Sequence, residues 1–114
     1  MATTAIDRID DLKPNVFPRE RKEEWIAELD ERMKREIYDN YLPADGKEKQ
    51  SDADLLSQKL DRVYLHWLEA QIDYWMGETA SYNNAIATFD AEYAEYAREY
   101  HKRHRHREAG VRWF

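Results

Sequence analysis

Histidines near the C-terminal end are the residues whose spacing first suggests chemistry. His101 and His104 are one helical turn apart, His106 follows, and Glu99 is the nearest carboxylate. Cationic side chains are interspersed among these histidines: Lys102, Arg103, Arg105 and Arg107. Because their positive field repels a metal cation, we expect a solvated basic helix end that matches the helix dipole, and no metal site. A contact with an acidic partner or with DNA phosphates is the next interpretation.

A second group of titratable residues lies in the middle of the chain. His66 stands between Leu65 and Trp67, and a single histidine on a partly apolar helix is usually a core or interface residue. Glu69 and Asp73 share a helix face, where we expect solvated acids or partners in interface salt bridges. Glycine-rich phosphate loops and HExxH motifs are absent from the sequence. We therefore expect no catalytic, cofactor-binding or metal-binding residues and no enzymatic activity.

The elements that position these residues are predicted to be helices of one small domain. The 114 residues include three Gly, three Pro and no Cys, which excludes disulfides and sulfur-ligated zinc. Hydrophobic residues make up 42% and charged residues 37%, which argues against both disorder and a membrane span. The first residues, MATTAIDRIDDLK, have acids where a signal peptide has an apolar core, so we expect a protein made in the cytoplasm.

Apolar spacing predicts two amphipathic helices in the first part of the chain. The first runs from about Thr4 to Leu12 and is stopped by Pro14. The second starts near Pro18 and runs to about Asn40. Its apolar face recurs every four residues, at Trp25, Leu29, Met33 and Ile37. Residues 42–51 follow as a polar loop.

A third, longer helix is predicted to end at Trp75, where Gly77 can adopt the left-handed conformation of a helix C-cap. Its start is open: Asp52 or Asp54 is the early alternative and Asp61 the late one. Because this helix is apolar on two sides, we expect it to be central and packed on both. It should form an antiparallel hairpin with the helix that follows the glycine.

The fourth helix begins at Thr79 or Ser81 and carries an aromatic seam with alternating spacings of four and three residues. The seam consists of Tyr82, Ile86, Phe89, Tyr93, Tyr96 and Tyr100. Its first half is typical of a core stripe. The phenols of its second half need hydroxyl partners, which a subunit interface can supply. We therefore predict subunit contacts through these residues: Tyr64, Trp67, Trp75, Tyr93, Tyr96 and Tyr100.

These elements predict an all-α bundle of about four helices, with a long C-terminal helical hairpin and an extended C-terminal tail. Residues 1–110 would form the helical domain and residues 111–114 a docking tail. The net charge is -6, yet the C-terminal end is basic, so the body is acidic. A small nucleic-acid-binding regulator that uses this basic helix end is the alternative function, although its electrostatic footprint would be small.

A long pattern in the second half of the chain resembles a family of small phage and prophage proteins. It comprises residues 63–74, Gly77-Glu78 and residues 81–89, with Tyr93 and Tyr100, and it matches the core "LEAxIDYxxGExxxYNN" followed by a Phe/Tyr-rich helix. Residues 9–15 and 25–30, leading to Glu36-Ile37, match the first half of the same family. The resemblance covers nearly the whole chain up to about Arg103. The chain departs from the family pattern in two ways. It lacks the proline-containing segment that relatives usually have before the third helix, which suggests an earlier helix start. Its C-terminal end is also more basic than the family pattern leads us to expect.

The members of this family resemble the head-to-tail adaptor (connector) proteins of tailed bacteriophages. The resemblance implies a homo-oligomeric ring, twelvefold in symmetry, that binds beneath the portal protein in the neck of the virion. Such a ring extends the DNA channel, lets DNA pass without sequence-specific binding, and seats a neck stopper or tail-completion protein. We expect acidic residues to line the channel, and no membrane partner. We expect portal docking through the basic end and the tail: Arg103, Arg105, Arg107, Arg112, Trp113 and Phe114.

Overall fold

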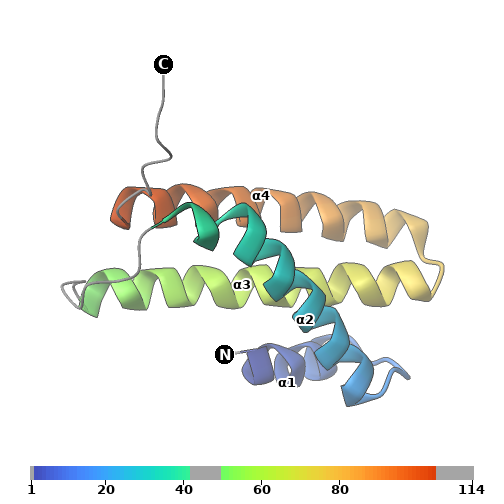
Figure 1. Ribbon diagram of the computed structural model, residues 1–114. Helices are drawn as coiled ribbons and strands as arrows, with labels where there is room; N and C mark the ends of the chain where they lie inside the picture. Colours follow the sequence, from blue (N-terminus) through green and yellow to red (C-terminus); the bar gives the residue numbers. More distant parts are fainter. Residues whose placement is uncertain (1, 42–49, 105–114) are drawn as a thin grey trace.

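The computed structural model describes residues 2–41 and 50–104 of the chain. Within these ranges the chain is an all-α bundle of four α-helices with one short 3-10 turn, as the sequence predicts (Figure 1). The elements are α1 (Ala2–Leu12), α2 (Arg19–Glu36), η1 (Tyr38–Asn40), α3 (Gln50–Trp75) and α4 (Thr79–Arg103). Residues 111–114, the predicted tail, lie outside the described ranges. None of the described helices combines the length and the apolarity that crossing a bilayer requires.

A glycine turn joins α3 and α4 into the predicted antiparallel hairpin (Figure 1). Gly77 has a φ of 74°, in the left-handed region that favours glycine. The Glu78 N–H donates to the Asp73 carbonyl at 2.9 Å, and the Gly77 N–H donates to the Tyr74 carbonyl at 3.2 Å. This pair of bonds is the Schellman motif, which satisfies carbonyls that the end of α3 would otherwise leave free. The predicted helix cap is confirmed.

Helix α3 begins at Gln50, two residues before the early alternative at Asp52 and within the predicted loop, so the late alternative at Asp61 is wrong. Its first turns are held by packing: Leu56 is 7% exposed and belongs to the same apolar core as Tyr96 of α4. No proline interrupts this stretch, so the helix continues along its neighbour.

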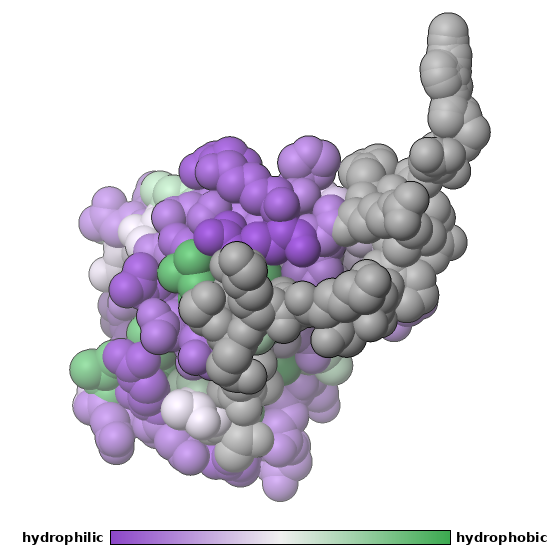
Figure 2. Space-filling model, turned by 90° about the vertical axis from the view of Figure 1, so that its left-hand side faces the viewer, coloured by the Kyte–Doolittle hydropathy of each residue, from purple (hydrophilic) through white to green (hydrophobic). Residues whose placement is uncertain are grey.

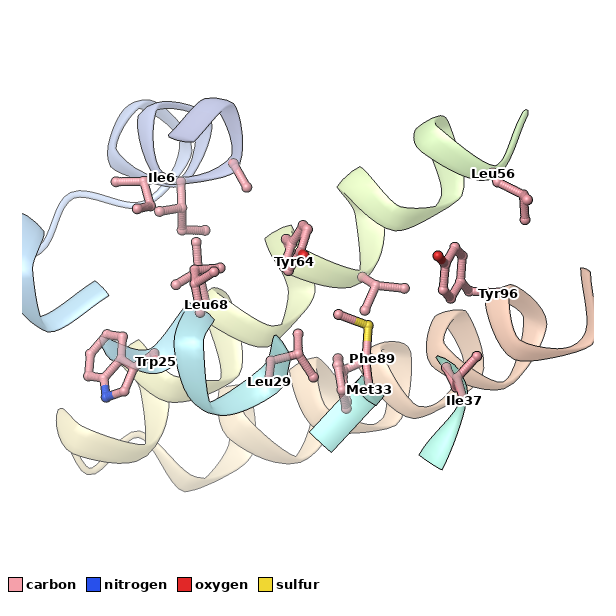
Figure 3. Packing of buried hydrophobic residues seen from close by; sticks show 14 of the residues in the cluster. Ile6, Trp25, Leu29, Met33, Ile37, Leu56, Tyr64, Leu68, Phe89 and Tyr96 are labelled. Carbon is pink, nitrogen blue, oxygen red and sulfur yellow. The ribbon is translucent and has the colours of Figure 1, made fainter. Parts of the chain in front are cut away.

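Helix α3 is central, as its two apolar sides predict. It packs against α1, α2 and α4, with its largest contact along α4. Figure 3 shows Leu68 and Tyr64 of α3 facing side chains of other helices in one apolar cluster. The fully buried apolar residues of this cluster come from all four helices: Ile6, Leu29, Met33, Val63, Leu68, Ile72 and Phe89.

The second helix ends earlier than predicted. Helix α2 stops at Glu36, and η1 carries the chain on to Asn40. Ile37, at the break, turns its side chain into the core and is 3% exposed. The Asn40 side-chain amide donates to the Glu36 carbonyl at 2.9 Å, so a local hydrogen bond replaces one that a continued helix would make.

Candidate interaction surfaces

Two phenols of the α4 seam, Tyr93 and Tyr96, have their hydroxyl partners inside the chain. Tyr96 is 3% exposed, and its hydroxyl lies 2.8 Å from the hydroxyl of Tyr38. Tyr93 is half-buried and donates to Glu36 Oε1 at 2.6 Å. The inference that these hydroxyls require a neighbouring subunit is therefore wrong. The break between α2 and η1 brings the Tyr38 ring toward α4, and sequence periodicity could not show this.

The end of the seam forms an aromatic stack with the first histidines of the basic end. The Tyr100 ring stacks on the His104 ring, with centroids 3.7 Å apart and planes 8° apart. The Tyr41 hydroxyl lies 3.0 Å from His101 Nδ1, and this links the end of η1 to α4. In the parts of the chain that the structure describes, no group of three His, Asp or Glu residues is placed to hold a metal ion. His106 is outside those parts.

Two α3 residues that we predicted at a subunit interface belong to the protomer's own packing. Tyr64 is 7% exposed and donates a hydrogen bond to Asp30 Oδ1 at 2.5 Å. Trp67 is half-buried, donates from Nε1 to the Trp25 carbonyl at 2.7 Å, and packs on Phe89. Since Tyr64 and Tyr96 offer almost no surface, the prediction of subunit contacts through them is wrong. Trp67, Tyr93 and Tyr100 keep some exposed surface, and their interface role stays a prediction.

Trp75 lies on an exposed apolar surface at the hairpin turn. Tyr74, Trp75 and Met76 are 58%, 54% and 43% exposed, and the two aromatic rings contact each other edge to face. The last residue of α1, Leu12, is 65% exposed, and Val16 in the connection that follows is 89% exposed; between them, Lys13 contacts Asp73 near the same end. We call these five exposed residues the turn surface. Exposed apolar residues gathered at one end are typical of a protein-binding surface.

The surface at the opposite end of the molecule is more hydrophilic than the turn surface (Figure 2). Figure 2 faces the end where α3 begins and α4 finishes, and its coloured surface is mostly hydrophilic with small hydrophobic areas. The strongly exposed large hydrophobic side chains of the described residues are those of the turn surface.

Asp73 of α3 is not part of the solvated face that the sequence suggests. Asp73 is 1% exposed, and the Lys13 ammonium lies 2.6 Å from its Oδ1. With His66 and Glu69 it lines a polar cleft of about 260 Å³ between α3 and the start of α4. The prediction of a solvated Asp73 is wrong because the end of α1 packs over this part of α3. Lys13 was missed because no local pattern links it to a residue sixty positions away.

In the described part of the basic end, the cationic side chains of Lys102 and Arg103 pair with a carboxylate of the same helix. Arg103 donates to Glu99 Oε1 at 3.0 Å, and Lys102 lies 3.6 Å from the same carboxylate. The hydrogen bonds and charges of these cations outweigh partial desolvation and lower the pKa of Glu99. The other residues predicted to dock the portal lie outside the described residues: Arg105, Arg107, Arg112, Trp113 and Phe114. Their role stays a prediction.

Burial and acidic partners hold the core phenols in the protonated state. Burial, followed by hydrogen bonding to Asp30, raises the pKa of Tyr64 far above its ordinary value. Burial and the bond to Glu36 do the same for Tyr93, and burial and the bond to Tyr38 for Tyr96. The reciprocal effect is a lowered pKa for Glu36, caused first by the Tyr93 hydrogen bond. These side chains act as hydrogen-bond donors and acceptors within the protomer.

Comparison with known proteins gives no relative from which a function could be transferred. No protein-family model, curated protein or solved structure matches this chain.

Proposed function

We propose that this chain is a structural virion protein, a head-to-tail adaptor subunit that forms a ring beneath the portal of a tailed bacteriophage. The ring would extend the DNA channel and seat the next neck or tail protein. The observation that carries the proposal is the long pattern from Val63 to Phe89, which resembles this family across α3, the turn and the start of α4.

The placement of that pattern supports a role in protein contacts. Its polar and glycine residues lie at the hairpin turn and around the two cavities beside it. The turn surface at the same end leaves Tyr74 and Trp75 more than half exposed. A ring subunit needs surfaces that its neighbours cover, and apolar exposure of this kind is what such contacts bury. In this proposal a sister copy covers the turn surface.

The charge of the protein fits a channel wall. The net charge is -6, and a ring multiplies it by the number of copies. A wall of that sign repels DNA phosphates, so DNA would pass through without adhering. We propose that acidic side chains face the lumen and that the basic C-terminal end, with Trp113 and Phe114, docks on the portal.

Mass measurement of the purified protein with purified portal protein tests the proposal. We expect a complex with many copies of this chain per portal ring, and reduced binding after deletion of residues 111–114. Trp75→Ser should weaken assembly of the copies without unfolding the protomer, because Trp75 is 54% exposed. Glu28→Ser, on the exposed side of α2, is the matched control. A chain that remains monomeric at all portal concentrations contradicts the proposal.

A further inference from the structure

The polar cleft beside the hairpin turn has the composition of a binding site. It is lined by Lys13 just after α1, by residues of α3 and by residues of the first turns of α4. Its volume is about 260 Å³. Helix α3 contributes His66, Glu69 and Asp73, whose spacing of three and four residues places them on one face. The cleft is distinct from the apolar residues of the turn surface.

Asp73 and His66, which line this cleft, have buried polar atoms without a hydrogen-bond partner among the described residues. Asp73 is 1% exposed, and its Oδ2 accepts no hydrogen bond. The Lys13 ammonium lies 2.6 Å from Oδ1 and forms an ion pair with the carboxylate. His66 Nδ1 is likewise buried and unbonded. Buried polar atoms without partners are costly, so this arrangement favours a ligand that brings donors.

The charges that face the cleft leave it negative. Glu69 and Asp73 come from α3, and Lys13 at the end of α1 neutralises only one of them. The residues that α4 contributes are uncharged: Ser81, Asn84, Ala85 and Thr88. With His66 neutral, one carboxylate charge remains unbalanced, and a single cation would balance it.

The acceptors call for a ligand with several donors and one positive charge. A guanidinium group has five N–H donors in a planar fork and always carries its charge. A metal ion fits less well, because the described residues place no three His, Asp or Glu side chains around one point. Asp73 also borders the neighbouring cavity lined by Tyr74 and Tyr82, whose rings contact each other. A protein that delivers an arginine here would cover exposed aromatic side chains at the same time.

We propose that this cleft binds the guanidinium group of an arginine side chain presented by a partner protein. The Asp73 Oδ2 and the Glu69 carboxylate accept its N–H groups, and the excess negative charge holds it. Lys13 competes for the same carboxylate and keeps the empty site from being a bare buried charge. This inference concerns the chemistry of the cleft and stands apart from the proposed ring.

A titration of the full chain with N-acetyl-arginine amide, followed by amide and indole shifts in NMR, tests the proposal. We expect saturable shifts confined to residues around Asp73, with a dissociation constant in the millimolar range. N-acetyl-citrulline amide has nearly the same shape without the charge and should not bind. N-acetyl-lysine amide should bind more weakly, because it has fewer donors. Equal shifts from arginine and citrulline compounds, or shifts that never saturate, would overturn the proposal.

Variants separate ligand binding from structural support. Glu69→Gln keeps the Lys13–Asp73 pair and should weaken binding at least about tenfold, the effect of losing a charged hydrogen-bond partner. Lys13→Met removes the competing ammonium and should strengthen binding. Thermal unfolding of each variant checks that the fold is kept. If the Lys13→Met variant is folded but binds the arginine compound no better than the wild type, then the Lys13 ammonium does not compete with the guanidinium group for Asp73, and the proposed binding mode is wrong.

Discussion

At the residue scale, the sequence reveals which side chains are aromatic and periodic but not which polar atoms meet. The first half of the seam on α4 was predicted correctly as a core stripe, since Phe89 is buried, whereas Tyr96, which was predicted at a subunit interface, is buried as well. The hydrogen-bond partners of the seam hydroxyls were not predicted, because Tyr38 and Glu36 are more than fifty positions away from the seam along the chain. The ion pair between Lys13 and Asp73 was not predicted for the same reason. Long-range polar pairs have no periodic signature, and each requires the fold to be known.

The paired hydroxyls of Tyr38 and Tyr96 give a prediction at this scale. Tyr96→Phe leaves the half-buried Tyr38 hydroxyl without this partner, which should lower the free energy of unfolding by about 1–2 kcal/mol. Tyr38→Phe should have a similar cost. The double variant should cost clearly less than the two single changes together, because it removes both halves of one interaction. Urea unfolding measures all three.

Tyr74→Phe is the matched control for this cycle, because Tyr74 is 58% exposed and the substitution is the same. It should change the free energy of unfolding by less than about 0.5 kcal/mol. Strict additivity of Tyr38→Phe and Tyr96→Phe would show that the two hydroxyls do not interact.

At the element scale, the sequence predicted that each helix forms, but it predicted where a helix ends only when the conformational preference of one residue determines the end. Gly77 marks the end of α3 because the left-handed conformation there suits glycine. The start of α3 has no such marker, and packing of Leu56 against the core decides it. The end of α2 was placed too late, since Ile37 and Tyr38 continue the apolar pattern although the backbone changes direction between them.

The hairpin turn makes a prediction at the element scale. In Gly77→Ala the new Cβ would meet no atom within 4 Å, so any loss of stability comes from the left-handed backbone alone. We expect a loss of about 1–2 kcal/mol. Gly77→Asn should lose less, because asparagine tolerates this conformation better. Thermal unfolding of the two variants provides the measurement, and an alanine variant as stable as the wild type would show that the turn relaxes.

At the scale of the whole molecule, composition and periodicity led to the all-α bundle with α3 at its centre. They could not show where the exposed apolar residues gather, because exposure depends on which faces the other helices cover. Of the aromatic residues predicted to contact neighbouring subunits, Trp75 at the turn is more than half exposed, and its contact with a neighbour stays a prediction. The same burial that removed Tyr64 and Tyr96 from the surface ties α2, α3 and α4 together through their hydroxyls.

These buried phenols predict how the bundle responds to alkali. The pKa values of Tyr64, Tyr93 and Tyr96 are raised above the ordinary value of 10.0, chiefly by burial. Because the pKa of each phenol is raised in the folded state, its contribution to stability is complete below pH 10. This contribution is lost as the pH rises further, since the phenol ionises more easily in the unfolded chain than in the folded one. Each such phenol should reduce the free energy of unfolding by about 1.4 kcal/mol per pH unit above that point. Phenolate absorbance should therefore appear together with the loss of helical circular dichroism in one cooperative transition.

Tyr64→Phe distinguishes this mechanism from a general effect of alkali on lysine ion pairs such as Lys13–Asp73. Removing one buried phenol should make the fall of stability above pH 10 less steep, whereas Tyr74→Phe at the exposed turn provides the comparison. The substitution also leaves Asp30 without its donor, so the variant should start from a lower stability at neutral pH, and the slope is the informative quantity. Gradual ionisation of all tyrosines while the helices persist would show that solvent reaches these hydroxyls in the folded protein. In that case the hydroxyl contacts between α2, α3 and α4 would not be what holds the three helices in one cooperative unit.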